Sequence, residues 1–125
     1  MRKLQWLAVA AALALAPLTN AQAANCPAAS AWNVSHAAAV AGHVASGHAW
    51  DKHAGEYHGT TINSAARFKD LVEKTIKTSG VAMSNGRHKW WDATTKTIVI
   101  FNPKDGDCGT AFRPTAGKTY YDNQR

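Results

Sequence analysis

The hydrophobic pattern divides the chain into a helical first half and a β-rich second half. Residues 32–54 form an Ala-rich stretch interrupted only by glycines, which predicts one broken helix or two short ones. Residues 64–78 form the clearest helix, because their apolar side chains recur at i, i+3, i+4, i+7 and i+8 along one face. Asn63 or Ser64 is expected to cap its start, and Gly80 to end it.

The second half alternates short apolar runs with turn residues. Asn85-Gly86 is a strong hairpin signal, and the β-branched run 97–101 predicts a central, buried strand. The expected strands cover residues 81–84, 87–92, 96–101, 110–113 and 118–122. Helices followed by a meander of strands indicate an α+β fold, with the N-terminal helices packed on one face of a four- to five-stranded antiparallel sheet.

The N-terminus has the three-part order of a secretory signal. Met1-Arg2-Lys3 is positively charged, residues 4–18 are apolar, and Ala21-Gln22-Ala23 is a small-x-small cleavage sequence. We expect residues 1–23 to be a signal peptide and 24–125 to be a single domain. The apolar run is shorter than the ~20 residues of a membrane span, so an uncleaved anchor is the less favoured reading. The mature form is therefore expected to be secreted or periplasmic, with no membrane anchor.

Cys26 and Cys108 are the two cysteines of the chain. In an oxidising compartment they are expected to form a disulfide, which would close a long loop and add ~4 kcal/mol through lost chain entropy. Two free thiols or an intermolecular bridge are the alternatives.

The formal net charge is +6, from 14 Lys and Arg against 8 Asp and Glu. A basic surface favours polyanions such as nucleic acid, anionic lipid or an acidic polymer, although it also serves solubility alone.

Four of the six histidines, His43, His48, His53 and His58, are spaced five residues apart. Each step of five turns ~140° around a helix, so the four cannot share one helical face. The i, i+4 pairs typical of helical metal sites are absent. We therefore predict no metal ligands and no cofactor. A histidine-rich metal-binding protein, with loops that bring the ligands together, is the alternative.

Residues 47–58 combine two imidazoles, a lysine and two carboxylates between glycines. Imidazole titrates near neutral pH and suits proton transfer to and from a hydroxyl or a phosphate. His48 and His53 are the candidates for proton transfer, and Lys52 is a candidate for substrate binding. The alternative is that His53 is an ordinary surface or capping histidine.

Two later segments add cations and aromatic rings. Alternation along a strand places Arg87, Lys89 and Trp91 on one face, a combination suited to phosphate contact and base stacking. The opposite face would carry His88, Trp90 and Asp92, and at least one tryptophan is expected in the core.

Thr110 and Arg113 form the third candidate group, followed by Tyr120 after the next turn. A regular strand would place Thr110 with Phe112 on one face and Arg113 on the other, so Thr110 and Arg113 need a bulge or separate roles.

Together, the His-x-x-x-Lys-His sequence of 48–53, the amphipathic helix, and the meander with its Thr-x-Phe strand at 110–112 resemble a known group. The group is the barnase–EndoU–colicin–RelE superfamily of small metal-independent ribonucleases, many of which are toxin domains used in competition between bacteria. The best-matching segments are 48–53 and 85–122, about half of the expected mature domain.

The resemblance implies a role for each matching residue. His53 resembles the general base or acid of the first helix, with His48 as its partner or structural neighbour. Thr110 resembles the late-strand threonine that contacts phosphate, Arg87 and Arg113 are candidates for the cation, and Tyr120 is a candidate for the site tyrosine.

The leading hypothesis is a secreted, toxin-like endoribonuclease that cleaves RNA by metal-independent transesterification. RNA would be its substrate, and a cognate immunity protein a possible partner. The alternative is a non-catalytic secreted or periplasmic protein that binds an acidic polymer or a protein partner.

Overall fold

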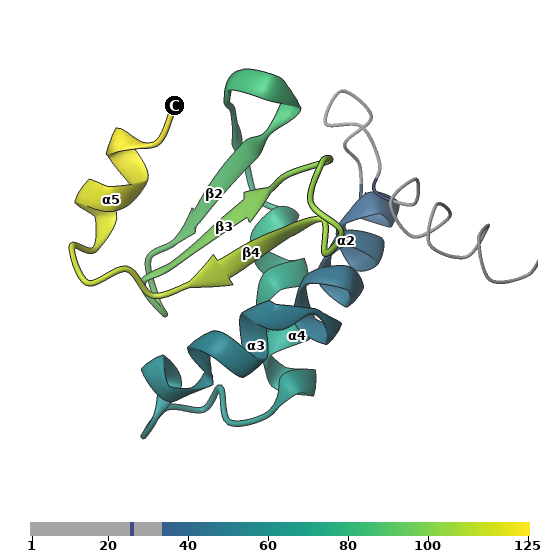
Figure 1. The fold of residues 1–125 in the computed structure, drawn as a ribbon. Coiled ribbons are helices and arrows are strands. Elements are labelled where there is room, and N and C mark those ends of the chain that lie inside the picture. Colours follow the sequence, from purple (N-terminus) through teal and green to yellow (C-terminus); the bar gives the residue numbers. More distant parts are fainter. Residues whose placement is uncertain (1–25, 27–33) are drawn as a thin grey trace, which may run out of the picture.

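A four-stranded antiparallel sheet with helices on one face organises the part of the chain that the structure, a computed structural model, describes: Cys26 and residues 34–125 (Figure 1). The strands are β1 (Val81–Ala82), β2 (His88–Asp92), β3 (Thr97–Phe101) and β4 (Gly109–Phe112), paired in the order β1-β2-β3-β4. The α+β fold class predicted from the sequence is confirmed, with four strands. The expected signal peptide lies outside the described residues.

The helical half contains α2 (Val34–Ser46), α3 (His48–His53) and α4 (Ala65–Ile76), with a short 3-10 helix η2 (Ala54–Tyr57) after α3. Gly47 separates α2 from α3, so the two-helix form of the prediction is the correct one. The Ser64 hydroxyl accepts a hydrogen bond from Arg67 N at 3.2 Å and caps α4, as the sequence predicts.

The core lies between these helices and one face of the sheet. α2 packs on α4, and both helices contact the strands. Across β2, β3 and β4, Trp90 pairs with Val99 and Val99 with Ala111, and all three belong to the core cluster. Trp90 is only 2% exposed, which confirms that one tryptophan of the Trp90-Trp91 pair is buried.

The next row of side chains points to the opposite face of the sheet. Here Trp91 pairs with Ile98, and Ile98 with Phe112. Helix α5 (Lys118–Asn123) contacts β2 on this face, and Tyr121 lies against Trp91 with ring centroids 6.0 Å apart. Figure 1 shows α5 on the side of the sheet away from α2, α3 and α4.

The predicted hairpin at Asn85-Gly86 is present between β1 and β2. Both residues have positive φ, and Arg87 N donates to Ser84 O at 3.3 Å. A two-residue turn with two left-handed positions matches the twist of antiparallel strands, which is why Asn-Gly is favoured there.

The prediction of a fifth strand at residues 118–122 is wrong, since these residues form α5. Arg113, directly after β4, is hydrogen-bonded to Glu56, and the segment that follows contacts β2 instead of pairing with β4. Lys118 and Asp122 form an ion pair of 2.9 Å at i, i+4, an arrangement that only a helix provides.

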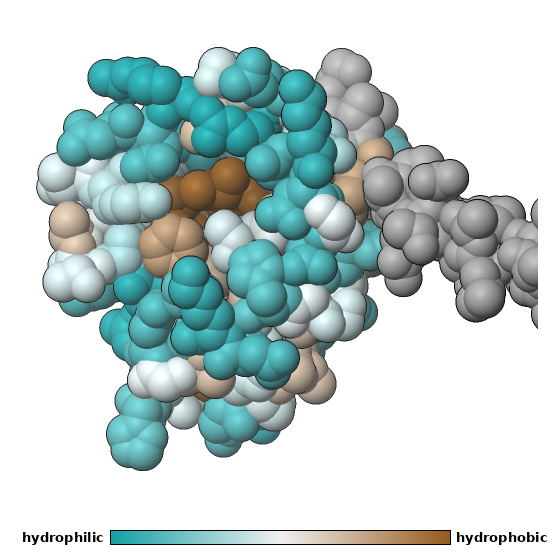
Figure 2. Space-filling view, in the orientation of Figure 1, coloured by the Kyte–Doolittle hydropathy of each residue, from teal (hydrophilic) through white to brown (hydrophobic). Residues whose placement is uncertain are grey.

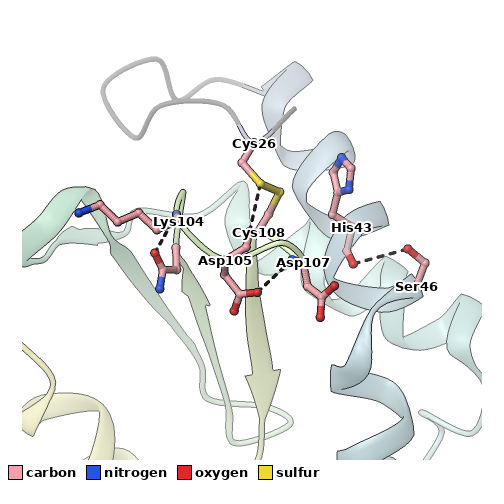
Figure 3. Close-up of a disulfide and its surroundings, with 8 residues drawn as sticks. Cys26, His43, Ser46, Lys104, Asp105, Asp107 and Cys108 are labelled. Carbon is pink, nitrogen blue, oxygen red and sulfur yellow. Dashed lines mark hydrogen bonds between the residues drawn. A yellow bond between two sulfur atoms is a disulfide. The ribbon is translucent and has the colours of Figure 1, made fainter. Parts of the chain in front are cut away.

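The predicted disulfide between Cys26 and Cys108 is present, with Cα atoms 5.5 Å apart (Figure 3). It ties a residue that precedes the helices to the loop before β4. Such a bond fits a protein that matures in an oxidising compartment. In the described part of the chain, no helix has the length and apolarity needed to cross a bilayer.

Candidate active site

His53 and Glu56 form the central pair of the candidate site. His53 is the last residue of α3, and Glu56 follows three positions later in η2, so both side chains point the same way. His53 Nδ1 lies 2.5 Å from Glu56 Oε2. A neutral imidazole that donates Nδ1–H to a carboxylate keeps the lone pair of Nε2 for accepting a proton. Nε2 has no hydrogen-bond partner within the described residues.

Arg113 fixes the carboxylate from the other side. Its main-chain N–H donates to Glu56 Oε1 at 2.8 Å, and its guanidinium Nη1 donates to Glu56 O at 2.8 Å. Arg113 directly follows β4, so these bonds attach η2 to the end of the sheet. Glu56 therefore bridges His53 and Arg113, two residues that are 60 positions apart in the sequence numbering.

Aromatic contacts connect His53 to the face of the sheet opposite the core, which carries Trp91, Ile98 and Phe112 and is called the open face below. Its imidazole stacks on the Phe112 ring, with centroids 5.0 Å apart and planes 22° from parallel. Phe112 in turn meets Tyr120 edge to face at 5.5 Å. The His53 side chain is 14% exposed, enough for one edge of the ring to reach solvent. His53 and Tyr120 thus lie on two sides of Phe112.

The open face of the sheet is hollow and apolar beside α5. Figure 2 shows a brown floor there, surrounded by a hydrophilic rim. By strand register, the floor side chains of this face include Ile98 and Ile100, with Trp91 and Phe112 next to Ile98. Ile100, Trp91 and Phe112 are all half-buried. Aromatic rings and aliphatic groups therefore meet solvent in one concave area.

Thr110 lies on this same face, opposite Ile100, with its side chain half-buried. Lys52 is exposed on α3, directly before His53. The strand alternation places Thr110 and Phe112 together, as predicted, and Arg113 reaches the other side to contact Glu56. Thr110 and Arg113 therefore have separate positions in the site.

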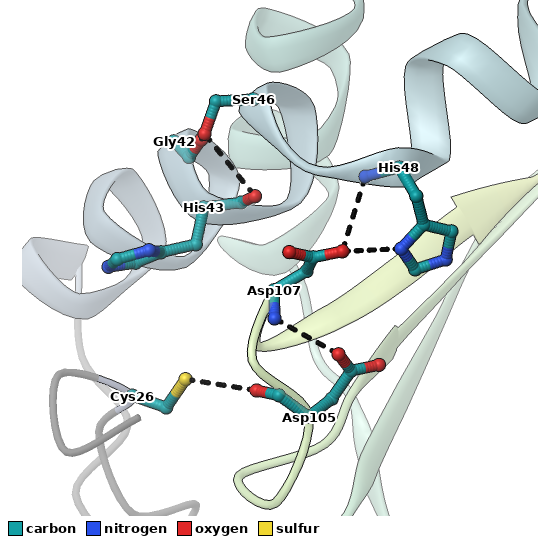
Figure 4. A network of polar contacts seen from close by, with 7 residues as sticks. All are labelled: Cys26, Gly42, His43, Ser46, His48, Asp105 and Asp107. Atoms are coloured by element: carbon teal, nitrogen blue, oxygen red, sulfur yellow. Dashed lines mark hydrogen bonds and ion pairs between the residues drawn. The ribbon is translucent and has the colours of Figure 1, made fainter. Parts of the chain in front are cut away.

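His48 lies apart from this group, at the opposite end of α3. Its Nδ1 is in contact with Asp107 Oδ2, and its main-chain N–H donates to the same oxygen at 3.2 Å (Figure 4). The hydrogen bond to the His48 side chain is the main reason that the pKa of the Asp107 carboxyl group is lowered. Since His53 is bonded to Glu56, the two histidines of the sequence cluster have different carboxylate partners.

Arg87 and Lys89 bind the C-terminal segment. Arg87 Nη2 donates to Arg125 O at 2.6 Å, and Lys89 Nζ donates to Tyr121 O at 2.6 Å. Lys89 is only 6% exposed. Both cations are thus engaged with main-chain oxygens of the protein itself.

Tyr57 lies beneath Arg113. The guanidinium carbon is 5.7 Å from the Tyr57 ring centroid, and a cavity of about 180 Å³ is lined by both residues. The Tyr57 hydroxyl lies 2.8 Å from Thr97 Oγ1 inside the core. Burial raises the pKa of Tyr57 to about 12, so this hydroxyl stays protonated and serves the fold.

Within Cys26 and residues 34–125, no three His, Cys, Asp or Glu side chains lie close enough together to hold a metal ion. Comparison of this chain with known proteins gave no matching family model, no matching curated protein and no matching solved structure.

Two polar residues of the site and its surroundings, Glu56 and Asp107, are not predicted from the sequence. The composition of residues 47–58 does not distinguish Glu56 from the other carboxylate there, although its i, i+3 spacing from His53 is a usable signal. Asp107 gave no signal at all, because its partner His48 is 59 residues away.

Proposed function

We propose that the chain is a secreted, toxin-like endoribonuclease that cleaves RNA by metal-independent transesterification. The observation that carries the proposal is the His53–Glu56 pair. A carboxylate holds Nδ1, Nε2 has no partner among the described residues, and the ring stacks on a residue of the open sheet face. This is the arrangement that a general base needs.

In the proposed reaction, His53 Nε2 takes the proton of a ribose 2′-hydroxyl. The 2′-oxygen forms a bond to the adjacent phosphorus, and the bond from phosphorus to the 5′-oxygen breaks. We assign Tyr120, on the other side of Phe112, as the acid that protonates the departing 5′-oxygen. The products are a 2′,3′-cyclic phosphate and a 5′-hydroxyl, and no redox step is involved.

The developing negative charge on the phosphate needs donors and cations. Arg113 uses Nη1 for Glu56 and keeps further N–H groups for a phosphate. Lys52 is exposed one residue before His53, and Thr110 carries its hydroxyl on the open face. Because Thr110 and Arg113 have separate positions in the site, we assign them to different phosphates of the RNA, with Lys52 as a further cation.

The hollow beside α5 favours single-stranded RNA. Unpaired bases stack on exposed aromatic faces, whereas a paired helix presents mainly its backbone. Trp91, Phe112, Tyr120 and Tyr121 are all half-buried around this face. Residues 24–125 carry 12 Lys and Arg against 8 Asp and Glu, and this net charge of +4 favours a polyanion. RNA is thus the proposed substrate, and an immunity protein that covers this face is the proposed partner in the producing cell.

The test uses protein exported with its own leader and purified in the oxidised state. It is incubated with a mixed single-stranded RNA in excess EDTA, beside His53→Ala and the control His58→Ala, which changes an exposed histidine five residues later. We expect cyclic phosphate ends from the wild type and His58→Ala, no cleavage by His53→Ala, and no cleavage of a 2′-deoxy substrate.

Full activity of the His53→Ala variant would show that His53 is not the general base. No cleavage by folded wild-type protein would reject the ribonuclease. If that protein still bound RNA in a salt-sensitive manner, the non-catalytic binding protein would replace it.

A further inference from the structure

Helix α3 connects the proposed base to a loop at the other end of the site. It has six residues, begins at His48 and ends at His53. A helix this short is not stable by itself, so its position depends on contacts from the rest of the protein. At the His53 end, those contacts are Glu56 and Phe112. The His48 end of α3 needs contacts of its own.

Asp107, in the loop between β3 and β4, holds the beginning of α3. Its Oδ2 accepts a hydrogen bond from His48 N at 3.2 Å and contacts His48 Nδ1 (Figure 4). The residue before the helix, Gly47, has no side chain to cap it. A Cβ at Gly47 would lie 2.4 Å from Asp107 Cγ, so the carboxylate occupies the place where a side chain would be. Asp107 thus supplies the helix cap from a distant segment.

The disulfide holds this loop in turn. Cys108 follows Asp107 directly, is fully buried, and is bonded to Cys26 (Figure 3). Its φ of 62° lies in the left-handed region, which a non-glycine residue adopts at a cost. Asp105 completes the loop, because its Oδ1 accepts from Asp107 N at 3.0 Å and its carbonyl oxygen accepts from Cys108 N at 2.9 Å. The unfavourable backbone conformation is thus supported by the cross-link.

We propose that Asp107 is a positioning residue for His53 and that the Cys26–Cys108 disulfide is the redox gate that keeps it in place. The proposal rests on the proposed function in so far as it concerns RNA cleavage. The path runs from the disulfide through Asp107 to His48, and along α3 to His53. Asp107 touches neither the proposed substrate nor His53, so it acts only through the helix.

The gate gives the producing cell a means of protection. Before export, the cysteines are thiols in a reducing cytoplasm, the loop is not cross-linked, and α3 lacks its fixed cap. After export, the thiols lose two electrons and two protons to a disulfide oxidant, and α3 is fixed. In the reverse direction, a dithiol reductant supplies two electrons and two protons and becomes a disulfide itself. Cys108 is fully buried and Cys26 is half-buried, so such a reductant reaches the disulfide through the Cys26 sulfur.

The experiment compares four proteins: the oxidised wild type, the wild type reduced with dithiothreitol, Asp107→Asn with its disulfide intact, and Asp70→Asn. Asp70 is an exposed aspartate of α4, so it controls for the same chemical change. Two readouts are taken: hydrogen exchange of amides 48–53, and the kcat and KM of RNA cleavage. The exchange readout does not depend on activity, so it tests Asp107 even if the protein is not a ribonuclease.

We expect faster exchange of residues 48–53 in the reduced protein and in Asp107→Asn, with α4 unchanged in Asp107→Asn. We also expect kcat to fall about tenfold or more with little change in KM, because the base is misplaced rather than lost. Unchanged exchange at 48–53 in Asp107→Asn would overturn the positioning role, even if reduction unfolds the whole protein. If the reduced wild type exchanges faster at residues 48–53 but keeps the kcat of the oxidised protein, the redox gate is overturned.

Discussion

The ammonium group of Lys89 donates to the main-chain oxygen of Tyr121 at 2.6 Å, and so attaches strand β2 to the C-terminal end of helix α5. The same nitrogen donates to Gln124 O at 3.0 Å and lies 4.2 Å from the Tyr121 ring centroid. The last carbonyl groups of a helix lack partners within it, and a cation satisfies them. Lys89 therefore holds α5 over the open face of the sheet, although burial lowers the pKa of its ammonium group.

Lys89→Met should detach α5 while it preserves the apolar length of the side chain. The loss of hydrogen bonds from a buried charged group predicts a decrease of about 1.5–3 kcal/mol in the free energy of unfolding. Hydrogen exchange at residues 118–123 should also become faster. Urea denaturation and exchange measurements test both effects.

The matched control for this change is Lys104→Met, because Lys104 is exposed and no partner of its side chain is found among the described residues. It should leave the stability within about 0.5 kcal/mol of the wild type. If Lys89→Met is as stable as the wild type and its RNA binding depends less on salt, the structural role of Lys89 is contradicted. Lys89 would then be a residue that contacts phosphate.

Helix α5 also shows where local sequence information ends. Tyr120 and Tyr121 are residue types enriched in strands, and they follow a turn, so the sequence favours a strand there. Contacts from distant parts of the chain decide otherwise: α5 packs against β2, and Lys89 donates to carbonyl oxygens at the end of the helix. Neither contact can be read from residues 118–122 alone. By contrast, the Asn85-Gly86 hairpin and the Ser64 cap were predictable, because each depends on neighbouring residues.

The same distinction applies to the candidate site. His53 and Glu56 are three residues apart, so their contact follows from helical geometry. His48 belongs to the same sequence cluster, yet its partner Asp107 comes from the loop before β4. Arg113 was predicted to be a cation of the site, but its hold on the Glu56 carboxylate depends on how η2 meets the end of β4.

Trp90 and Trp91 are neighbours with opposite surroundings, and this predicts opposite effects of truncation. Trp90 is buried against the helices, so Trp90→Ala should cost about 3–5 kcal/mol of folding free energy. Trp91 is half-buried beside Tyr121, so Trp91→Ala should cost less and should weaken binding of single-stranded RNA. Denaturation curves and fluorescence anisotropy with a labelled RNA separate the two effects. Undiminished RNA binding by Trp91→Ala would count against the hollow as the base-binding surface.

Glu56→Gln should lower RNA cleavage while the fold remains intact. The amide no longer offers two carboxylate oxygens, one to His53 Nδ1 and one to Arg113 N, so the base is less well oriented. We expect kcat to fall about 10- to 100-fold with KM nearly unchanged. Glu73→Gln changes a half-buried carboxylate of α4 that pairs with Lys77, and it should retain full activity. Equal rates for both variants would show that Glu56 does not support His53.

Because the Tyr57 hydroxyl is buried, we predict that the folded protein loses stability in alkaline solution. Its pKa is raised from an ordinary value near 10.0 to about 12 in the folded protein, chiefly by burial of the hydroxyl. Between these two pH values the unfolded chain loses the proton while the folded chain keeps it, so the free energy of unfolding falls as pH rises. The fall should be about 1.4 kcal/mol per pH unit and should end above the folded pKa. Below pH 10 this contribution is fully present.

Tyr57→Phe isolates this effect. Losing the hydrogen bond to Thr97 should cost about 1 kcal/mol at neutral pH, where Thr97 Oγ1 still accepts from Thr95. Because phenylalanine does not ionise, the variant should lose less stability than the wild type between pH 10 and 12, and the two curves should approach or cross. Urea denaturation at pH 9, 10 and 11 measures the slopes. Parallel slopes would mean that Tyr57 ionises as readily in the folded chain as in the unfolded chain, contrary to its burial in the core.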